Sequence, residues 1–208
     1  MKILFFGDSI TDAGWVRNGE GAYVYGFGYV REIAGELLDR NPEKYQIINS
    51  GVCGNRIVDL YSRIKLNVWE KRPDVLTILV GVNDIWHEVL SQNGVDILRF
   101  EKIYDMLIED TKKVLPNTKI ILLEPFVLPG YATVEHFDEF NKVRDYAKVV
   151  EKLADKWGAY FVPLQAEFDK ASKKHPASCY LYDGVHPDVA GAKLIARNWL
   201  KCFDENFN

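Results

Sequence analysis

Residues 75–80 have the sequence Val75-Leu76-Thr77-Ile78-Leu79-Val80, a short run that is apolar apart from one threonine. Four more short runs rich in Ile, Leu, Val, Phe or Tyr occupy residues 2–6, 45–49, 119–123 and 160–162. Runs of this length and composition are typical of strands in a parallel sheet, which are buried on both faces and need no polar alternation. The sequence therefore predicts a buried parallel sheet.

Apolar residues recur every three to four positions between these runs, which is the spacing of a helix that buries one face. The helices predicted in this way cover residues 29–38, 97–114, 134–157 and 187–203. Pro187 would occupy the first turn of the last helix, where proline is favoured. Strands that alternate with helices of this length form right-handed βαβ units, so we predict a doubly wound, three-layer αβα domain.

The chain shows no internal repeat, low-complexity tract or linker, so we predict a single domain over residues 1–208. The apolar run at 2–6 stops at Gly7-Asp8 with no small-residue cleavage site after it, which favours a first strand over a signal peptide. No apolar stretch reaches the roughly 18 residues that a membrane span needs. We expect no membrane partner.

The charge balance and the cysteines exclude several classes of protein. Lys and Arg number 26 against 30 Asp and Glu, a net charge of −4, so the basic surface that binds nucleic acid is not expected. Three widely spaced cysteines without a C-x-x-C pair argue against a disulfide framework and against a zinc site; they are Cys53, Cys179 and Cys202. This cysteine usage predicts a reducing, cytoplasmic compartment.

A serine follows the first predicted strand, within Gly7-Asp8-Ser9. Ligands of doubly wound sheets bind beyond the carboxyl ends of the strands, so the Ser9 hydroxyl is a candidate nucleophile. The same residues would equally well cap a turn or a short helix. The sequence contains no G-x-S-x-G motif, which disfavours an ordinary α/β-hydrolase.

Two further segments at strand ends carry groups that could bind an oxyanion. Gly54, in the loop after the second strand, would let a backbone N–H approach a ligand closely. Asn83, after the third strand, offers a neutral amide donor for a developing oxyanion. A tight turn around Gly54 and an Asx-turn or helix cap at Asn83 are the structural alternatives.

The strongest local signal is Asp183-Gly184-Val185-His186, which leads into the last predicted helix. A serine nucleophile needs a base, and an imidazole with a pKa near 6.5 accepts a proton at neutral pH. Asp183 would then bind the Nδ1 proton of His186 and fix its tautomer. None of the other three histidines has a carboxylate at such a spacing, so His186 ranks ahead of His87, His136 and His175.

Taken together, these four ordered segments resemble the motif blocks of the SGNH (GDSL-like) hydrolase family, between residues 7 and 187. The resemblance implies a flavodoxin-like sheet of five parallel strands and a serine esterase without a cofactor. It also implies that Ser9, His186 and Asp183 form the catalytic triad. Backbone N–H groups of Ser9 and Gly54 and the side-chain amide of Asn83 would then form the oxyanion hole. Ile10 and Cys53 depart from the family's usual residues, but neither change removes a catalytic atom.

Within that family, the segments around Asn83 and His186 look like those of the carbohydrate acetylesterase branch, notably acetylxylan esterases. The expected partner is thus a small-molecule or oligosaccharide ester. Residues that would line a sugar site are Asp8, Trp15, Tyr23, Tyr25 and Trp86, because aromatic faces suit the apolar faces of sugar rings. Packing of the long loop at 14–28 would account for most of these aromatics equally well.

Other functions remain open on the sequence alone. A lipase, a broad acylhydrolase or a thioesterase would use the same triad. A metal-dependent phosphoesterase would use Asp8, Asn83, Asp183 and His186 as ligands, although a single histidine among four donors is few for a two-metal site. A non-catalytic carbohydrate-binding domain would need the aromatics but no triad. We predict no metal, and a homo-oligomeric state stays open.

Overall fold

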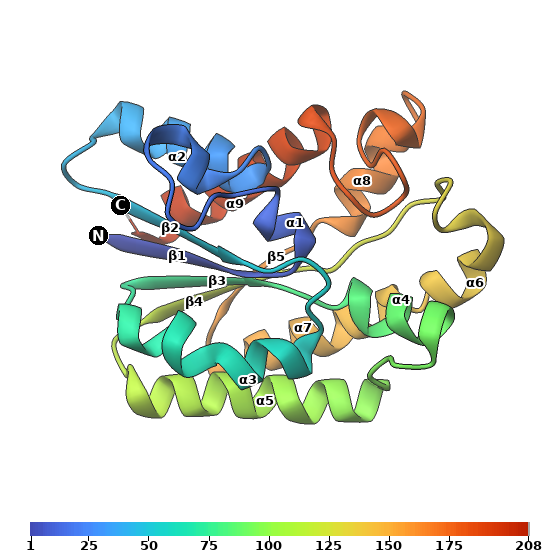
Figure 1. The fold of residues 1–208 in the computed structure, drawn as a ribbon, viewed down its shortest axis with the longest axis horizontal. Coiled ribbons are helices and arrows are strands. Elements are labelled where there is room, and N and C mark those ends of the chain that lie inside the picture. The colour runs from blue at the N-terminus through green and yellow to red at the C-terminus, as the bar shows by residue number, and fades with distance from the viewer. Residues whose placement is uncertain (208) are drawn as a thin grey trace.

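The computed structural model describes residues 1–207 of the chain. Its strands are β1 (Lys2–Gly7), β2 (Gln46–Gly51), β3 (Val75–Leu79), β4 (Lys119–Leu123) and β5 (Tyr160–Val162). They form one parallel sheet in the order β2-β1-β3-β4-β5 (Figure 1). The predicted fold class is therefore confirmed.

Helices cover both faces of the sheet (Figure 1). On one face α2 (Tyr29–Arg40) packs beside α9 (Val189–Phe207), and on the other face lie α3 (Ile57–Asn67), α5 (Ile97–Val114) and α7 (Val143–Trp157). The shorter helices are α1 (Ser9–Asp12), α4 (Val82–Ser91), α6 (Phe137–Phe140) and α8 (Gln165–Ser172). The 3-10 turns are η1 (Gly21–Tyr25), η2 (Trp69–Lys71), η3 (Val134–His136) and η4 (Ala177–Cys179).

One continuous hydrophobic core fills the space between the layers. On one side of the sheet, the Phe5 ring lies 5.7 Å from the ring of Tyr29 and 5.4 Å from that of Trp199. Burial of each such side chain contributes roughly 1.5–3 kcal/mol. Thr77, the polar residue in the third strand, is fully buried and accepts a hydrogen bond from Trp199 Nε1 at 2.9 Å. The threonine therefore satisfies the only polar atom of that indole.

Two of the predicted helices differ from the structure. The helix predicted at 134–157 is wrong as a single element, because i→i−3 hydrogen bonds around Asn141 and Lys142 separate α6 from α7. The first-turn position predicted for Pro187 is also wrong. Pro187 instead forms an isolated bridge with Leu181, and the last helix begins two residues later.

The chain switches direction within the sheet at β1, because β2 lies on one side of that strand and β3 on the other. Loops that leave β1 and β3 at their carboxyl ends therefore diverge and leave room for a ligand between them. Both ends of the described chain, residues 1 and 207, lie at the amino ends of the strands, opposite this site (Figure 1). Met1 precedes β1, and the ring of Phe207 lies 4.9 Å from that of Tyr160, the first residue of β5.

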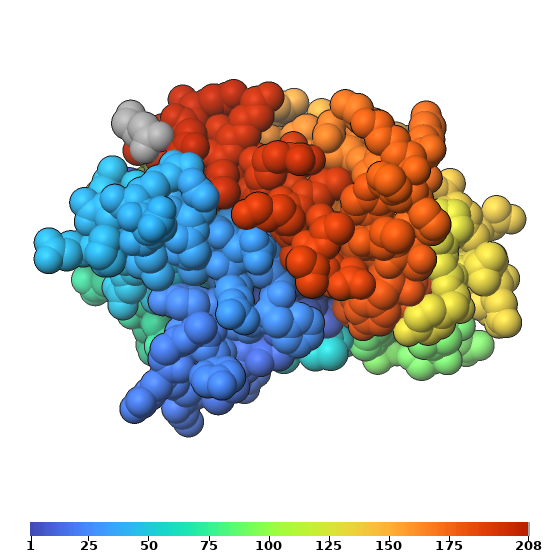
Figure 2. Space-filling model, turned by 90° about the horizontal axis from the view of Figure 1, so that it is seen from above, coloured from blue at the N-terminus to red at the C-terminus, as the bar shows by residue number. Residues whose placement is uncertain are grey.

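Residues 14–28 form a long excursion that protrudes from the molecule, in blue at the lower left of Figure 2. Tyr23 and Phe27 within it are largely exposed. Asn49 of β2 anchors its base, because the Asn49 amide donates to the carbonyl oxygens of Thr11 and Tyr25.

None of the helices in residues 1–207 combines the length and the apolarity that crossing a bilayer requires. All three cysteines are free thiols.

Candidate active site

The structure brings together the three residues of the predicted triad. Ser9 is the first residue of α1, and its Oγ lies 2.9 Å from Nε2 of His186. On the other side of the ring, Nδ1 of His186 lies 2.6 Å from Oδ2 of Asp183. Because Nδ1 faces a carboxylate, we assign its proton there, which leaves Nε2 free to accept the proton of the Ser9 hydroxyl.

The loop before α9 fixes the Asp183 carboxylate. Its Oδ1 accepts hydrogen bonds from the backbone N–H groups of Val185 and His186, at 2.9 and 2.7 Å. Gly184 makes this tight loop possible with a φ of +103°, and a Cβ there would lie only 2.5 Å from Thr133 Oγ1. Any other residue would be strained in this conformation.

Burial and pairing act in opposite directions on both titrating groups of the triad. Burial raises the pKa of Asp183, but hydrogen bonds from the His186 ring and from two backbone N–H groups outweigh it, so that pKa is lowered. Burial lowers the pKa of His186, but the hydrogen bond and the charge of Asp183 outweigh it and raise that pKa above 6.5. The pair therefore favours an ionised aspartate, as a triad requires.

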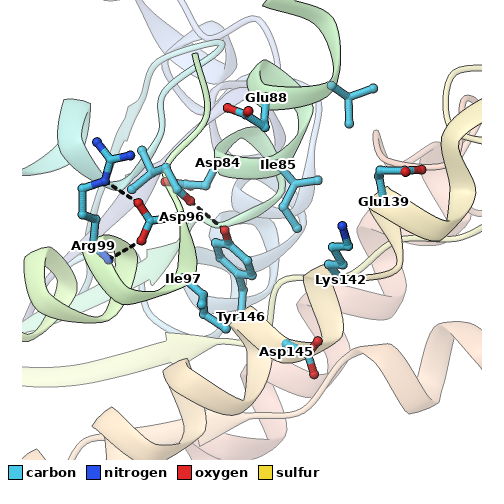
Figure 3. A pocket seen from close by; sticks show the side chains of 12 residues that line it. Asp84, Ile85, Glu88, Asp96, Ile97, Arg99, Glu139, Lys142, Asp145 and Tyr146 are labelled. Atoms are coloured by element: carbon cyan, nitrogen blue, oxygen red, sulfur yellow. Dashed lines mark hydrogen bonds and ion pairs between the residues drawn. The ribbon is translucent and has the colours of Figure 1, made fainter. Parts of the chain in front are cut away.

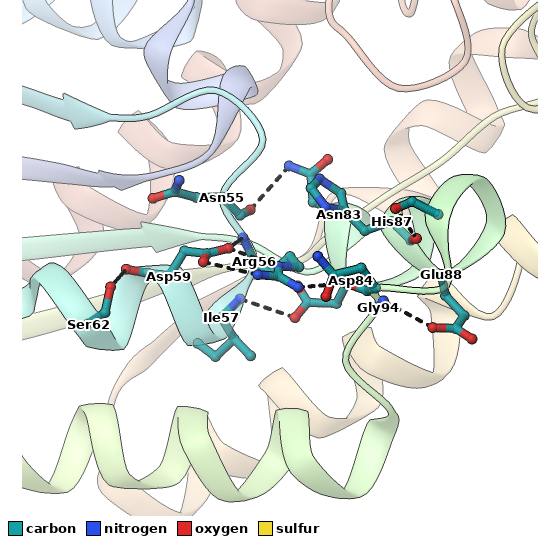
Figure 4. Close-up of polar contacts among 12 residues, drawn as sticks. Asn55, Arg56, Ile57, Asp59, Ser62, Asn83, Asp84, His87, Glu88 and Gly94 are labelled. Carbon is teal, nitrogen blue, oxygen red and sulfur yellow. Dashed lines mark hydrogen bonds and ion pairs between the residues drawn. The ribbon is translucent and has the colours of Figure 1, made fainter.

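The three predicted oxyanion donors lie in the segments that follow β1, β2 and β3, which are neighbouring strands of the sheet. Asn83 stands in the first turn of α4, and its Nδ2 donates to the carbonyl oxygen of Asn55 at 3.1 Å (Figure 4). Gly54 immediately precedes Asn55 and has a φ of +78°. Within residues 1–207, the N–H groups of Ser9 and Gly54 donate to no backbone acceptor. The second N–H of the Asn83 amide and the backbone N–H groups of Ser9 and Gly54 are therefore available to donate to an oxyanion.

Two aromatic rings flank the imidazole of His186. The ring of Tyr182 stacks on it, with centroids 5.8 Å apart and planes 19° apart. The ring of Trp86 lies 5.7 Å away and also packs edge-on against Phe140. Tyr182 is 46% exposed, so its outer face is open to a ligand.

The other predicted substrate residues do not share the position of Trp86 beside the imidazole ring. Trp15 donates its indole N–H to the carbonyl oxygen of Gly51, at the end of β2. Tyr23 and Tyr25 belong to the protruding excursion, and Tyr23 is largely exposed. Asp8 is fully buried, so its side chain cannot contact a substrate in this conformation.

Asp8 and Asp84 are instead two buried carboxyls beneath the site. Oδ1 of Asp8 caps α1 by accepting from the N–H of Ile10, and burial raises the pKa of Asp8 to about 7. Oδ1 of Asp84 accepts from the N–H of Ile57, and burial likewise raises its pKa (Figure 4). Across residues 1–207, no cluster of three or more His, Cys, Asp or Glu side chains is arranged to hold a metal.

Sequence reasoning assigned no role in the site to four residues that lie in or beside it. Tyr182 adjoins the aspartate of the last motif, and that position was its only signal. Arg63 and Asn55 interact with the loops that carry the oxyanion donors, but no motif contains Arg63. His87 lies beside the Gly54 loop: a Cβ atom added to Gly54 would be 3.9 Å from Nε2 of His87.

A pocket of about 380 Å³ lies on another face of α4 (Figure 3). Ile85, Glu88 and Tyr146 are among its lining residues, and it contains none of the triad. The predicted triad therefore does not lie in this cavity.

A family model for the GDSL-like lipases and acylhydrolases matches residues 5–194. The chain belongs to this family. The acetylxylan esterase of Geobacillus stearothermophilus is 34% identical to it over 208 residues, which cover 96% of this chain and 92% of that protein.

Solved structures of this GDSL-like family give the same picture. A protein described as a GDSL-like lipase from Parabacteroides merdae is 37% identical, with a TM-score of 0.93 over 98% of this chain and 95% of its own. Axe2, the acetylxylan esterase from G. stearothermophilus, is 33% identical, with a TM-score of 0.87 over 100% of this chain and 94% of its own. Catalytic mutants of Axe2 replace a serine, an aspartate or a histidine by alanine.

Proposed function

We propose that this GDSL-like hydrolase is a serine esterase that removes small acyl groups, chiefly acetyl, from a carbohydrate such as a xylo-oligosaccharide. The observation that carries the proposal is the hydrogen-bonded chain from Ser9 Oγ through His186 to Asp183. A hydroxyl, an imidazole and a carboxylate in this order form the arrangement that activates serine for acyl transfer.

The proposed reaction has two halves. His186 Nε2 takes the hydroxyl proton as Ser9 Oγ bonds to the ester carbonyl carbon, and the oxyanion formed accepts hydrogen bonds from Ser9, Gly54 and Asn83. The intermediate then collapses: the bond to the sugar oxygen breaks, His186 protonates that oxygen, and acyl-Ser9 remains. Water attacks the acyl group with His186 again as the base, releasing acetate and free Ser9.

Two features support a sugar as the alcohol part of the ester. The exposed ring of Tyr182 and the half-buried ring of Trp86 both pack against the catalytic imidazole, where they would contact the leaving group. Aromatic faces suit sugar rings. In addition, Axe2 is described both as an acetylxylan esterase and as an acetyl-xylooligosaccharide esterase.

The reaction class is tested with an aryl acetate. Ser9→Ala should abolish turnover and prevent inactivation by a serine-directed sulfonyl fluoride, whereas a chelator should leave the rate unchanged. Ser62→Ala is the matched control, because Ser62 is exposed and its hydroxyl only donates to the Asp59 carbonyl. Loss of activity with chelator and retention in Ser9→Ala would indicate a metal-dependent mechanism, such as a phosphoesterase uses, instead of a serine nucleophile.

The substrate class is tested with aryl esters of increasing acyl length beside acetylated xylo-oligosaccharides. A pocket discriminates by only about 1–3 kcal/mol per methylene, so the rate should decline steeply from acetyl to butyryl without vanishing. Octanoyl esters cleaved faster than acetyl esters would indicate a lipase or a broad acylhydrolase, and faster acyl-thioester cleavage a thioesterase.

Trp86→Ala separates the sugar from the acyl group. Because Trp86 also packs against His186, both substrates should lose some kcat. The acetylated sugar should lose more kcat/KM than the aryl acetate, since only the sugar would use the ring face. An equal loss would contradict the carbohydrate assignment and leave the esterase assignment standing.

The cytoplasmic location and the lack of a nucleic-acid partner remain predictions from the sequence, and the oligomeric state remains open.

A further inference from the structure

We propose that Arg63 is a positioning residue for the oxyanion hole, holding the segments that carry all three donors in one arrangement. This inference rests on the proposed function, because it assigns Arg63 a role in the same reaction. Arg63 projects from α3, the helix that follows the Gly54 loop.

Every donor nitrogen of the Arg63 guanidinium has a partner near the carboxyl ends of β1 and β2. Nη2 donates to the carbonyl oxygen of Gly7 and Nη1 to that of Ser50, both at 2.9 Å. Nε donates to the side-chain oxygen of Asn55 at 2.6 Å. A planar guanidinium can hold acceptors from three segments in fixed relative positions, which a lysine ammonium on a flexible stem cannot.

Each of these contacts lies close to one proposed donor. Gly7 is two residues before Ser9, and its carbonyl also accepts the N–H of Val52 in the Gly54 loop. Asn55 directly follows Gly54, and its carbonyl oxygen accepts the hydrogen bond from Asn83. Arg63 is therefore connected to Ser9 through Gly7, to Gly54 through Asn55, and to Asn83 through the same Asn55.

The surroundings of Arg63 are unusual for a residue with only a stabilising role. Its guanidinium carbon stands 4.3 Å from the centre of the Phe6 ring. Burial lowers the pKa of Arg63 to about 10, so the group remains charged at neutral pH. Among the described residues it forms no ion pair, and all of its hydrogen-bond acceptors are neutral. The charges of Asp59, Asp12 and Asp8 offset only part of the effect of burial on this pKa. A partly desolvated cation with no carboxylate bonded to it is a costly way to gain stability alone.

A double-mutant cycle between Arg63→Lys and Asn83→Ala tests the inference with an aryl acetate as substrate. Arg63→Lys should lower kcat about 10–10²-fold with KM little changed, because small displacements of catalytic groups have effects of this size. Asn83→Ala should lower kcat roughly 10²–10³-fold. In the double variant the loss should fall well short of the product of the single losses, because both changes impair one oxyanion hole.

The control is Arg144→Lys. Arg144 lies in α7 and donates two hydrogen bonds to the carboxylate of Asp169, and neither residue belongs to the proposed site. It should lower the melting temperature and leave kcat unchanged. If Arg63→Lys behaves in the same way, or if the two losses in the cycle multiply, the inference is overturned.

Asn55→Ala keeps the test decisive if Arg63→Lys fails to fold. It removes the link from Nε and leaves the other two guanidinium bonds, so it should lower kcat in the same direction by a smaller factor. Unchanged kcat in Asn55→Ala would overturn the inference. The proposed function is judged separately by Ser9→Ala: loss of turnover there with normal kcat in Arg63→Lys refutes only the role of Arg63.

Discussion

His186 moves every proton in the proposed reaction, so its titration reports directly on the site. The base must be neutral, and Asp183 raises the pKa of His186 above its ordinary 6.5. We therefore expect kcat/KM to rise with pH through that raised pKa and to level off above it. A rate profile from pH 5 to 8 measures this, and a flat profile would remove His186 from the role of base.

The charge of Asp183 can be tested separately from its hydrogen bond. Asp183→Asn removes the negative charge that raises the pKa of His186, so the acidic limb of the profile should move to lower pH. At the same time kcat should fall by about 10⁴-fold, the loss seen when such an aspartate becomes an amide. Asp155→Asn, in an exposed residue of α7, should change neither quantity.

Asp8 predicts how stability changes with pH. Its pKa is about 7 in the folded protein against an ordinary 3.8, so between these values the folded state binds a proton that the unfolded state has lost. Raising the pH through this window therefore lowers the free energy of unfolding. Asp8→Asn should flatten this dependence between pH 4 and 8 in urea-unfolding measurements, and Asp39→Asn, in an exposed residue, should not. Equal slopes in wild type and Asp8→Asn would contradict the assignment.

The sequence predicted the residues whose chemistry is local. The pair Asp183 and His186 lies within four residues of chain, and Ser9 and Asn83 each follow a strand, so composition and position sufficed. Arg63 acts through three segments that meet only in the folded protein. Asp8 looked like a substrate ligand because its polarity is visible in the sequence and its complete burial is not.

At the scale of the helices and strands, replacement of glycine by alanine should have opposite effects on stability at two positions. Gly35 lies exposed in the interior of α2 with open space around it, so Gly35→Ala should raise the free energy of unfolding by about 0.5–1 kcal/mol. In Gly51→Ala the new Cβ would lie 2.1 Å from the backbone nitrogen of Asp12 in α1. That substitution should cost about 1–3 kcal/mol or more.

Kinetics distinguish the same two variants. Because α1 carries Ser9, Gly51→Ala should also lower kcat, whereas Gly35→Ala should not. Urea unfolding and aryl acetate turnover on the same preparations measure both effects. A stable Gly51→Ala variant with full activity would contradict the prediction that this contact with α1 positions Ser9.

Strands were easier to predict than helices in this protein. The central strands β1, β3 and β4 are buried on both faces, so a short apolar run identifies each of them without reference to its neighbours. The helices α3, α4 and α8 were not predicted. They are 11, 10 and 8 residues long, and α4 begins within the site motif around Asn83, which was not assigned to a predicted helix. The break between α6 and α7 depends on local i→i−3 backbone hydrogen bonds, which apolar spacing does not encode.

On the scale of the whole molecule, we propose that residues 1–208 unfold as one domain. One continuous core joins both layers of helices to the sheet. Thermal unfolding followed by tryptophan fluorescence and by far-UV circular dichroism should therefore give a single, coincident transition. The five tryptophans are spread along the chain from Trp15 to Trp199, so the fluorescence reports on all layers. Two separated transitions would contradict this proposal.

Both ends of the described chain lie at the amino edge of the sheet, while Ser9, Asn83 and His186 lie at the carboxyl edge (Figure 1). A tether attached to either end would consequently orient the molecule in the same sense. On a bead or an electrode, the mouth of the site would face the solution, and a bulky polymeric ester could approach it without crossing the support.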